Sequence, residues 1–179
     1  MKKNITPILF LDIDGPLVND RTYVGLASPG DKATLAVAGL DLNNFDPVGV
    51  GIINSLCKET GALVVISSTW KHFDGQSRNI IFGKEAERPN DPFDLREHLR
   101  SVGLDVPYHK DWKTFPKLSG SRGLEIKDWL DDHPKVKLWC AIDDDNSFSI
   151  EMRSNLVLVD AENGISFKDY LKARSLLRK

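Results

Sequence analysis

The sequence has little cysteine and no long apolar run, and both absences exclude classes of protein. Among its 179 residues only Cys57 and Cys140 are cysteines, with no CxxC pair and no histidine nearby at zinc-ligand spacing. This excludes a disulfide scaffold and a cysteine-rich zinc site. No stretch approaches the ~20 apolar residues of a membrane span. The run Ile8–Leu11 is too short for a signal peptide and is followed by aspartates, so we expect a cytoplasmic protein.

The sequence also lacks an excess of either charge. It has 24 Lys and Arg against 26 Asp and Glu, a formal net charge of −2. This balance argues against a protein that coats nucleic acid by bulk charge, although it leaves a local basic groove open. The length and the ordinary composition fit one soluble globular domain over residues 1–179.

Apolar runs alternate with helix signals along the chain. Buried strands are expected at 8–11, 63–66, 138–142 and 156–159, with a short strand at 106–108. Helices are expected at 47–60, from Asp91-Pro92 to Val102, from Ser121 to shortly before Pro134, and from Ser166 onward. This alternation predicts an α/β fold with a mostly parallel sheet.

Polar residues directly follow three of these strands. Asp12 and Asp14 follow the first strand, Ser67 and Ser68 the second, and residues 143–145, all aspartate, the fourth. Ligands bind at the carboxyl ends of parallel strands, where clustered carboxylates repel unless a cation lies between them or one is protonated. Their oxygens suit Mg²⁺. Taken alone, each segment can be explained as a turn, a strand terminus or a solvated loop. These alternatives explain the combination of all three segments poorly.

These segments resemble motifs of the haloacid dehalogenase (HAD) superfamily. Residues 10–18 look like its first motif, 64–67 like its second, and 141–144 like its fourth, in the double-aspartate form. The HAD-type domain of bacterial RNA-repair proteins is a closer match, carried by Phe45-Asp46-Pro47, Ser67-Ser68-Thr69-Trp70-Lys71, Trp129-Leu130 and His133-Pro134. The resemblance implies a Rossmann-like three-layer sandwich.

The resemblance also implies a Mg²⁺-dependent phosphatase that forms an aspartyl-phosphate. Asp12 would be the nucleophile. Asp14 would protonate the leaving oxygen and then activate water. The metal ligands would be Asp12, the backbone carbonyl of Asp14 and Asp144, which falls on the usual ligand position; whether Asp143 also binds the metal stays open.

Phosphate binding is expected from hydroxyls, amides and one cation. Ser67 would hydrogen-bond the phosphoryl group, helped by the backbone amide of Ile13 or of Ser68. The family usually places a lysine at the start of the helix before its fourth motif. The matching position here is Arg122, whose guanidinium can bind phosphate with two nitrogens. Lys127 and Lys117 are the alternatives.

Irregular insertions near 19–45 and 71–91 are too short for a large cap domain. An open site would admit a bulky substrate, including a polynucleotide end. Lys71 and His72, just after the second motif, are further candidates for substrate contact.

The segment 108–117 interleaves cations with aromatic residues. Cations track phosphates and aromatic rings stack on bases. The alternative is a loop in which Trp112 and Phe115 pack into the core. Nucleic-acid or nucleotide phosphomonoesters are therefore the leading substrate class. The alternatives are a small-metabolite phosphatase and a catalytically silent binding module, and no protein partner and no membrane association are expected.

Overall fold

A computed structural model describes residues 6–22, 45–77, 90–115 and 121–178 of the chain. Five strands form one parallel sheet in the order β3-β2-β1-β4-β5. They are β1 (Ile8–Leu11), β2 (Leu63–Ile66), β3 (Tyr108–Lys113), β4 (Trp139–Asp143) and β5 (Leu156–Leu158). The expected α/β class with a parallel sheet is confirmed. Most of the two expected insertions, 23–44 and 78–89, lies outside the described residues.

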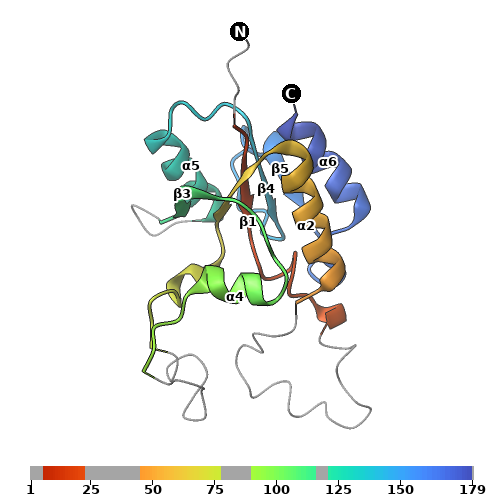
Figure 1. Ribbon diagram of the computed structural model, residues 1–179. Coiled ribbons are helices and arrows are strands. Elements are labelled where there is room, and N and C mark those ends of the chain that lie inside the picture. Colours follow the sequence, from red (N-terminus) through yellow and green to blue (C-terminus); the bar gives the residue numbers. More distant parts are fainter. Residues whose placement is uncertain (1–5, 23–44, 78–89, 116–120, 179) are drawn as a thin grey trace.

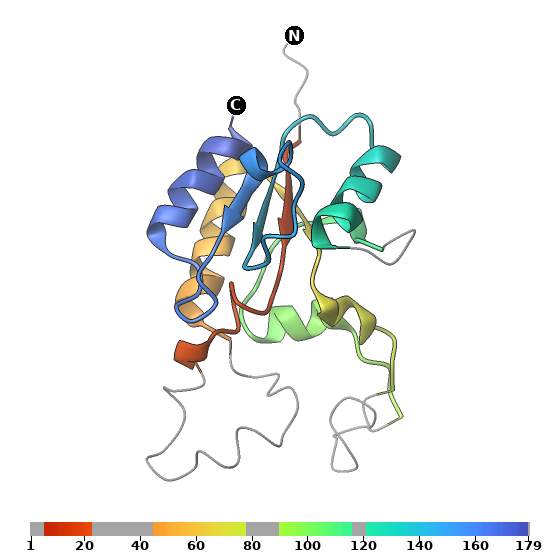
Figure 2. The ribbon, with the colours of Figure 1, turned by 180° about the vertical axis from the view of Figure 1, so that it is seen from behind.

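Helices cover both faces of the sheet (Figures 1 and 2). Helices α2 (Pro47–Thr60) and α6 (Phe167–Leu177) pack side by side on one face, and α5 (Arg122–Asp132) lies on the other. Successive residues of a strand point to opposite faces, so Leu9 and Leu11 join the core under α2 and α6 while Ile8 and Phe10 join the core under α5. The result is a three-layer sandwich with β1 at its centre.

Several helix ends follow from single residues that the sequence indicates. The Asp46 carboxylate accepts the backbone N–H of Val48 at 3.0 Å and caps α2. Gly61 ends that helix with a left-handed φ of 69°, a conformation that glycine adopts without strain. Ser166 and Asp169 form the expected capping box at the start of α6.

Two expected elements differ in position. The helix expected from Asp91-Pro92 begins instead at Leu95 as α4 (Leu95–Ser101), capped by Asp94. The strand expected at 106–108 is β3, which begins at Tyr108 and runs to Lys113. The strand expected at 138–142 lies one residue later, at 139–143. The strand expected at 156–159 ends one residue earlier, at 158. Two 3₁₀ helices, η1 (Thr69–His72) and η2 (Arg153–Asn155), complete the described elements.

Within the described part of the chain, none of the helices has both the length and the apolar character needed to cross a bilayer.

Candidate active site at the carboxyl edge of the sheet

The carboxyl ends of β1, β2 and β4 meet where the strand order reverses direction. The backbone N–H of Asp12 donates to Ile142 O at 3.0 Å, and that of Ser67 donates to Leu11 O at 3.0 Å. The sheet's hydrogen bonds therefore extend to the first polar residue after each strand. Sheets of this order bind ligands at such a switch point.

Three carboxylates converge there from two strands. Asp12, Asp143 and Asp144 each offer one oxygen atom, and these oxygens all lie within 4.8 Å of one another. Asp12 is 4% exposed and Asp143 is fully buried. Burial raises the pKa of all three carboxyls above the usual range, and raises that of Asp143 to about 8 with the Asp12 charge as the second cause. Two buried carboxylates and a partly exposed third this close together call for a cation.

Arg122, the first residue of α5, supplies one cation. Its Nη2 lies 3.5 Å from Asp12 Oδ2 and its Nε lies 3.1 Å from Asp143 Oδ2. The Nε and Oδ2 atoms are close but not aligned for a hydrogen bond. Gly123 lets the helix approach the loop after β4, because a Cβ atom there would lie 2.9 Å from Ser147 O. The structure thus brings Arg122 to the acids from another element.

Of the two other candidate cations, only Lys127 lies in the described part of the chain, and it pairs away from this cluster. Lys127 lies on an exposed part of α5 and pairs with Asp131 one turn later, at 2.5 Å. Lys117 lies outside the described residues. Arg122 is therefore the cation that the structure places beside the expected nucleophile.

Asp14 lies just outside the carboxylate cluster. Trp70 Nε1 donates to Asp14 Oδ1 at 2.9 Å and fixes one carboxylate oxygen. Burial raises the pKa of Asp14, and the Trp70 hydrogen bond partly opposes this shift. Trp70 itself is 1% exposed, so it packs in the core and positions the carboxylate from there.

Gly15 makes the tight turn after the two acids. Its φ is +79°, and a Cβ atom there would lie only 2.6 Å from Asp144 Cγ. The backbone after β1 and the carboxylate after β4 therefore touch at a point where no larger residue fits.

Both serines after β2 are buried, but their side chains differ in partners. Ser68 Oγ accepts the Trp70 N–H at 3.4 Å and caps η1. Ser67 Oγ is buried, and no hydrogen-bond partner for it is found among the residues that the structure describes. Buried hydroxyls are usually paired, so an unpaired one at this edge is available to a ligand.

Lys71 is a second cation near the site. The sequence suggests a contact with substrate for it, but in the structure it is buried. Lys71 is 1% exposed, and its Nζ lies 2.7 Å from Glu125 Oε2. The same oxygen accepts the Thr114 hydroxyl at 3.1 Å and lies 3.5 Å from Arg122 Nη1. Burial lowers the pKa of Lys71. Glu125 thus joins the buried lysine to the arginine, whereas His72 is exposed.

The described part of the basic and aromatic segment, 108–115, is mixed in character. Trp112 is half-buried against the core and lies under Arg96 and Lys113, at 4.8 and 4.6 Å from its ring centre. Phe115 is 55% exposed. The alternative in which both rings pack into the core therefore does not hold for Phe115, whose ring is largely exposed.

The chain was compared with known proteins. One protein-family model matches residues 8–170, nearly the whole chain, and is described as the HAD domain in Swiss Army Knife RNA repair proteins. No curated protein and no solved structure matches. The matched range includes every strand and every acidic residue described above.

Proposed function

The chain belongs to the family of HAD domains in Swiss Army Knife RNA repair proteins, and from this premise we propose that it is a Mg²⁺-dependent phosphatase acting through an aspartyl-phosphate. Family membership by itself indicates hydrolase chemistry of the phosphatase type. The observation that carries the finer proposal is the convergence of Asp12, Asp143 and Asp144 beside Arg122. Asp12 follows β1 directly, the position that the nucleophile occupies in this superfamily.

The residues present fit a hard divalent cation. Their donors are all oxygens, the carboxylates carry raised pKa values, and the Arg122 guanidinium lies against them. Asp12, Asp144 and the backbone carbonyl of Asp14 would hold Mg²⁺, with Asp143 next to them. The ion would offset the repulsion between the carboxylates and a phosphate dianion.

The nucleophile is held in place by hydrogen-bonding and charged neighbours. The Ile13 N–H donates to Asp12 Oδ1 at 2.8 Å, and Arg122 lies at Oδ2. In the first step an Asp12 oxygen bonds to phosphorus and the bond from phosphorus to the leaving oxygen breaks. Arg122 lies where it can balance charge on the transferring phosphoryl oxygens.

Asp14 serves first as acid and then as base. Its raised pKa favours the protonated form that donates to the leaving oxygen, and the Trp70 hydrogen bond to Oδ1 orients the carboxyl group. In the second step Asp14 takes a proton from water as the water oxygen bonds to phosphorus. The bond between phosphorus and Asp12 then breaks and inorganic phosphate leaves.

Ser67 and Ser68 complete the phosphate site. The unpaired, buried Ser67 hydroxyl supports a contact with a phosphoryl oxygen, and the Ser68 backbone amide lies next in the chain. Burial of such donors strengthens their hydrogen bonds to an anion.

Nucleic-acid ends or nucleotide phosphomonoesters are the substrate class that we favour. The family description refers to RNA repair, and the exposed ring of Phe115 lies near Lys113, whose Nζ is 5.5 Å from the ring centre. Rings stack on bases and cations bind phosphates. A small-metabolite phosphatase and a silent binding module are the alternatives that the assay must separate.

The experiment measures phosphate release with and without EDTA from 3′- and 5′-phosphorylated oligonucleotides, mononucleotides and sugar phosphates. We expect Asp12→Asn to lower the rate by ~10³-fold or more, and EDTA to abolish it until Mg²⁺ is restored. Asp131→Asn, which alters an exposed acid on α5, is the matched control and should keep full activity.

Each other outcome selects an alternative. Activity that persists in folded Asp12→Asn rejects the nucleophile. Release from sugar phosphates or mononucleotides but never from oligonucleotides selects the metabolite phosphatase. Phosphate binding without turnover selects the binding module.

A further inference from the structure

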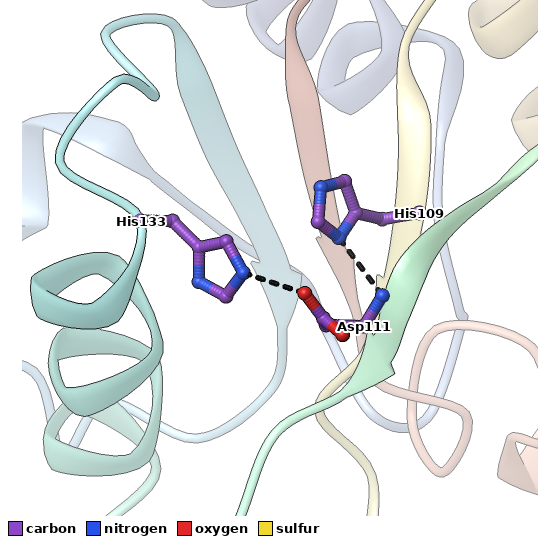
Figure 3. Close-up of side chains that lie close together, drawn as sticks. All are labelled: His109, Asp111 and His133. Atoms are coloured by element: carbon purple, nitrogen blue, oxygen red, sulfur yellow. Dashed lines mark hydrogen bonds and ion pairs between the residues drawn. The ribbon is translucent and has the colours of Figure 1, made fainter.

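A second group of metal-ligand side chains lies apart from the acidic cluster. His109, Asp111 and His133 each offer one ligand atom, and these three atoms lie within 4.8 Å of one another. Figure 3 shows His109 and Asp111 extending from β3 toward His133, which follows α5. None of the three residues belongs to the proposed phosphatase site, so the group needs its own explanation.

An irregularity in β3 creates this arrangement. Val64 pairs with Tyr108 and Ile66 with Lys113, so the single residue Val65 of β2 faces four residues of β3. Such bulges re-aim side chains and are enriched near functional sites. Here the bulged segment carries two of the three potential ligands at the free edge of the sheet.

His133 is held as metal-binding histidines commonly are. Its ring stacks on Trp129 with centroids 3.7 Å apart and 13° between the planes. Its Nδ1 lies 2.6 Å from Trp129 O, and its Nε2 lies 2.9 Å from Asp111 Oδ2. A backbone carbonyl at one ring nitrogen fixes the tautomer that leaves the other nitrogen free to bind a metal.

The contacts of His133 leave one of its ring nitrogens available to a metal ion. Both ring nitrogens face oxygen acceptors, yet a neutral imidazole carries only one N–H. With an ion between Nε2 and the carboxylate, Nδ1–H donates to the carbonyl and both remaining atoms bind the metal.

We propose that His109, Asp111 and His133 bind a divalent transition-metal ion of the Zn²⁺ class. Two imidazoles and one carboxylate form a donor set that suits Zn²⁺, whereas Mg²⁺ requires oxygen ligands. Ligand atoms on tetrahedral Zn²⁺ lie roughly 3.3 Å apart, so small side-chain rotations complete the site. The Asp111 side chain is 50% exposed, which leaves a path for the ion and room for water as a fourth ligand.

Binding has one identifiable cost at His109. Its Nδ1 accepts the Asp111 backbone N–H at 3.1 Å, and ligation by this ring replaces that contact. Because Asp111 is exposed, water can satisfy the freed N–H group. The ion in return links the edge strand β3 to the end of α5, so it should stabilise the folded chain.

The test uses chelator-treated full-length protein in excess Mg²⁺, which saturates oxygen-only sites. We expect one equivalent of Zn²⁺ by titration calorimetry, a rise in melting temperature, and visible absorption bands when Co²⁺ replaces Zn²⁺. His133→Gln and Asp111→Asn should each weaken Zn²⁺ binding by at least ~10-fold. His72→Gln changes an exposed histidine outside the group and should bind like the wild type.

Asp12→Asn separates this site from the phosphatase site. If Zn²⁺ binding survives in Asp12→Asn but weakens in Asp111→Asn, the His109, Asp111 and His133 site is supported whether or not the protein is a phosphatase. The proposal fails if the wild type binds no Zn²⁺, if both site variants bind as tightly as the wild type, or if Asp12→Asn alone abolishes binding. Circular dichroism checks that each variant folds. Because Asp111 is exposed, Asp111→Asn leaves the stack of His133 on Trp129 intact.

Discussion

At the scale of single residues, the candidate active site holds several carboxylates close together despite their mutual repulsion. Asp12, Asp14, Asp143 and Asp144 all carry raised pKa values, with burial as the largest cause. Arg122 lowers each of these pKa values, but the net shift stays upward. The carboxylates are therefore held close together at a cost that a bound divalent cation would offset.

Gly15 gives the first prediction at this scale. In Gly15→Ala the new Cβ meets Asp144 Cγ at 2.6 Å in a backbone with φ of +79°, so the carboxylate must move. We expect the Mg²⁺ concentration for half-maximal activity to rise by ~10-fold or more, since a displaced ligand weakens the site. Mg²⁺ titration of the phosphatase rate measures this.

Gly61→Ala is the matched control for backbone strain. Gly61 has a similar φ of +69°, but a Cβ atom there meets nothing within 4 Å. It should lose about 1–2 kcal/mol of unfolding free energy and keep its Mg²⁺ dependence. Equal Mg²⁺ dependence in both alanine variants would contradict the contact between Gly15 and Asp144.

The buried pair Lys71 and Glu125 gives an asymmetric prediction. In Lys71→Met the Glu125 carboxylate keeps Thr114 and Arg122 as neighbours, whereas in Glu125→Met the buried ammonium loses its hydrogen-bond partner. Leaving a buried charge unpaired costs ~3–5 kcal/mol. We therefore expect chemical denaturation to show a larger loss for Glu125→Met than for Lys71→Met, and the reverse order would contradict this account.

The residues of the site differ in how readily the sequence reveals them. Asp12, Asp14 and Asp144 follow apolar runs directly, so their position at the sheet edge can be predicted from pattern alone. Glu125 could not be predicted, because a glutamate in the first turn of a helix is usually a solvated residue that favours the helix dipole. Its role depends on Lys71, which comes from a different part of the chain.

At the scale of elements, two helices begin at a serine but are capped differently. Ser166 Oγ accepts the Asp169 N–H and forms a capping box at α6, whereas Ser121 makes no side-chain cap bond at α5. Ser166→Ala should therefore lower the unfolding free energy by about 1 kcal/mol. Ser121→Ala should change it by less than ~0.5 kcal/mol. Urea denaturation of both variants provides the comparison, and equal losses would contradict it.

Element boundaries were predictable where local signals agreed. Apolar runs located β1 and β2 to the residue, since strands buried on both faces are continuously apolar. The start of α4 is harder to predict, because Asp91-Pro92 and Asp94 are both helix-start signals. In the structure Asp94 caps the helix. Phe93 exchanges backbone hydrogen bonds with Gly75 and Gln76 at 2.7 Å each, which keeps the chain extended until Asp94.

The position of β3 was harder to predict. This edge strand carries mostly polar side chains and contains the bulge, so it has neither an apolar run nor regular alternation. Its pairing with β2 is decided by tertiary contact. The sequence also does not reveal the group formed by His109, Asp111 and His133, because the strand is irregular and His133 lies 22 residues after Asp111.

At the scale of the whole molecule, the strand order assembles the site from segments that are distant in sequence. The neighbours of β1 are β2 and β4, so the residues after these three strands meet at one edge. Helix α5 then brings Arg122 to that edge with its first residue and ends near His133. The two candidate metal sites thus lie near opposite ends of one helix.

This arrangement predicts two independent metal effects on the stability of the whole chain. Mg²⁺ at 100 times its dissociation constant should add about 2.7 kcal/mol, which raises the melting temperature by roughly 5–10 °C for a chain of this length. Asp144→Asn should abolish this rise. Because burial raises the pKa of Asp144, the charged form is unfavourable without metal, so the variant should melt no lower than the metal-free wild type.

The response to Zn²⁺ tests whether the two sites are separate. Asp144→Asn should keep the Zn²⁺-dependent rise in melting temperature, and His133→Gln should keep the rise with Mg²⁺, because no ligand is shared between the two groups. Calorimetry of both variants with each ion provides the four measurements. If either substitution removes both responses, the metals share one site or the fold couples them, and the assignment of two separate centres is wrong.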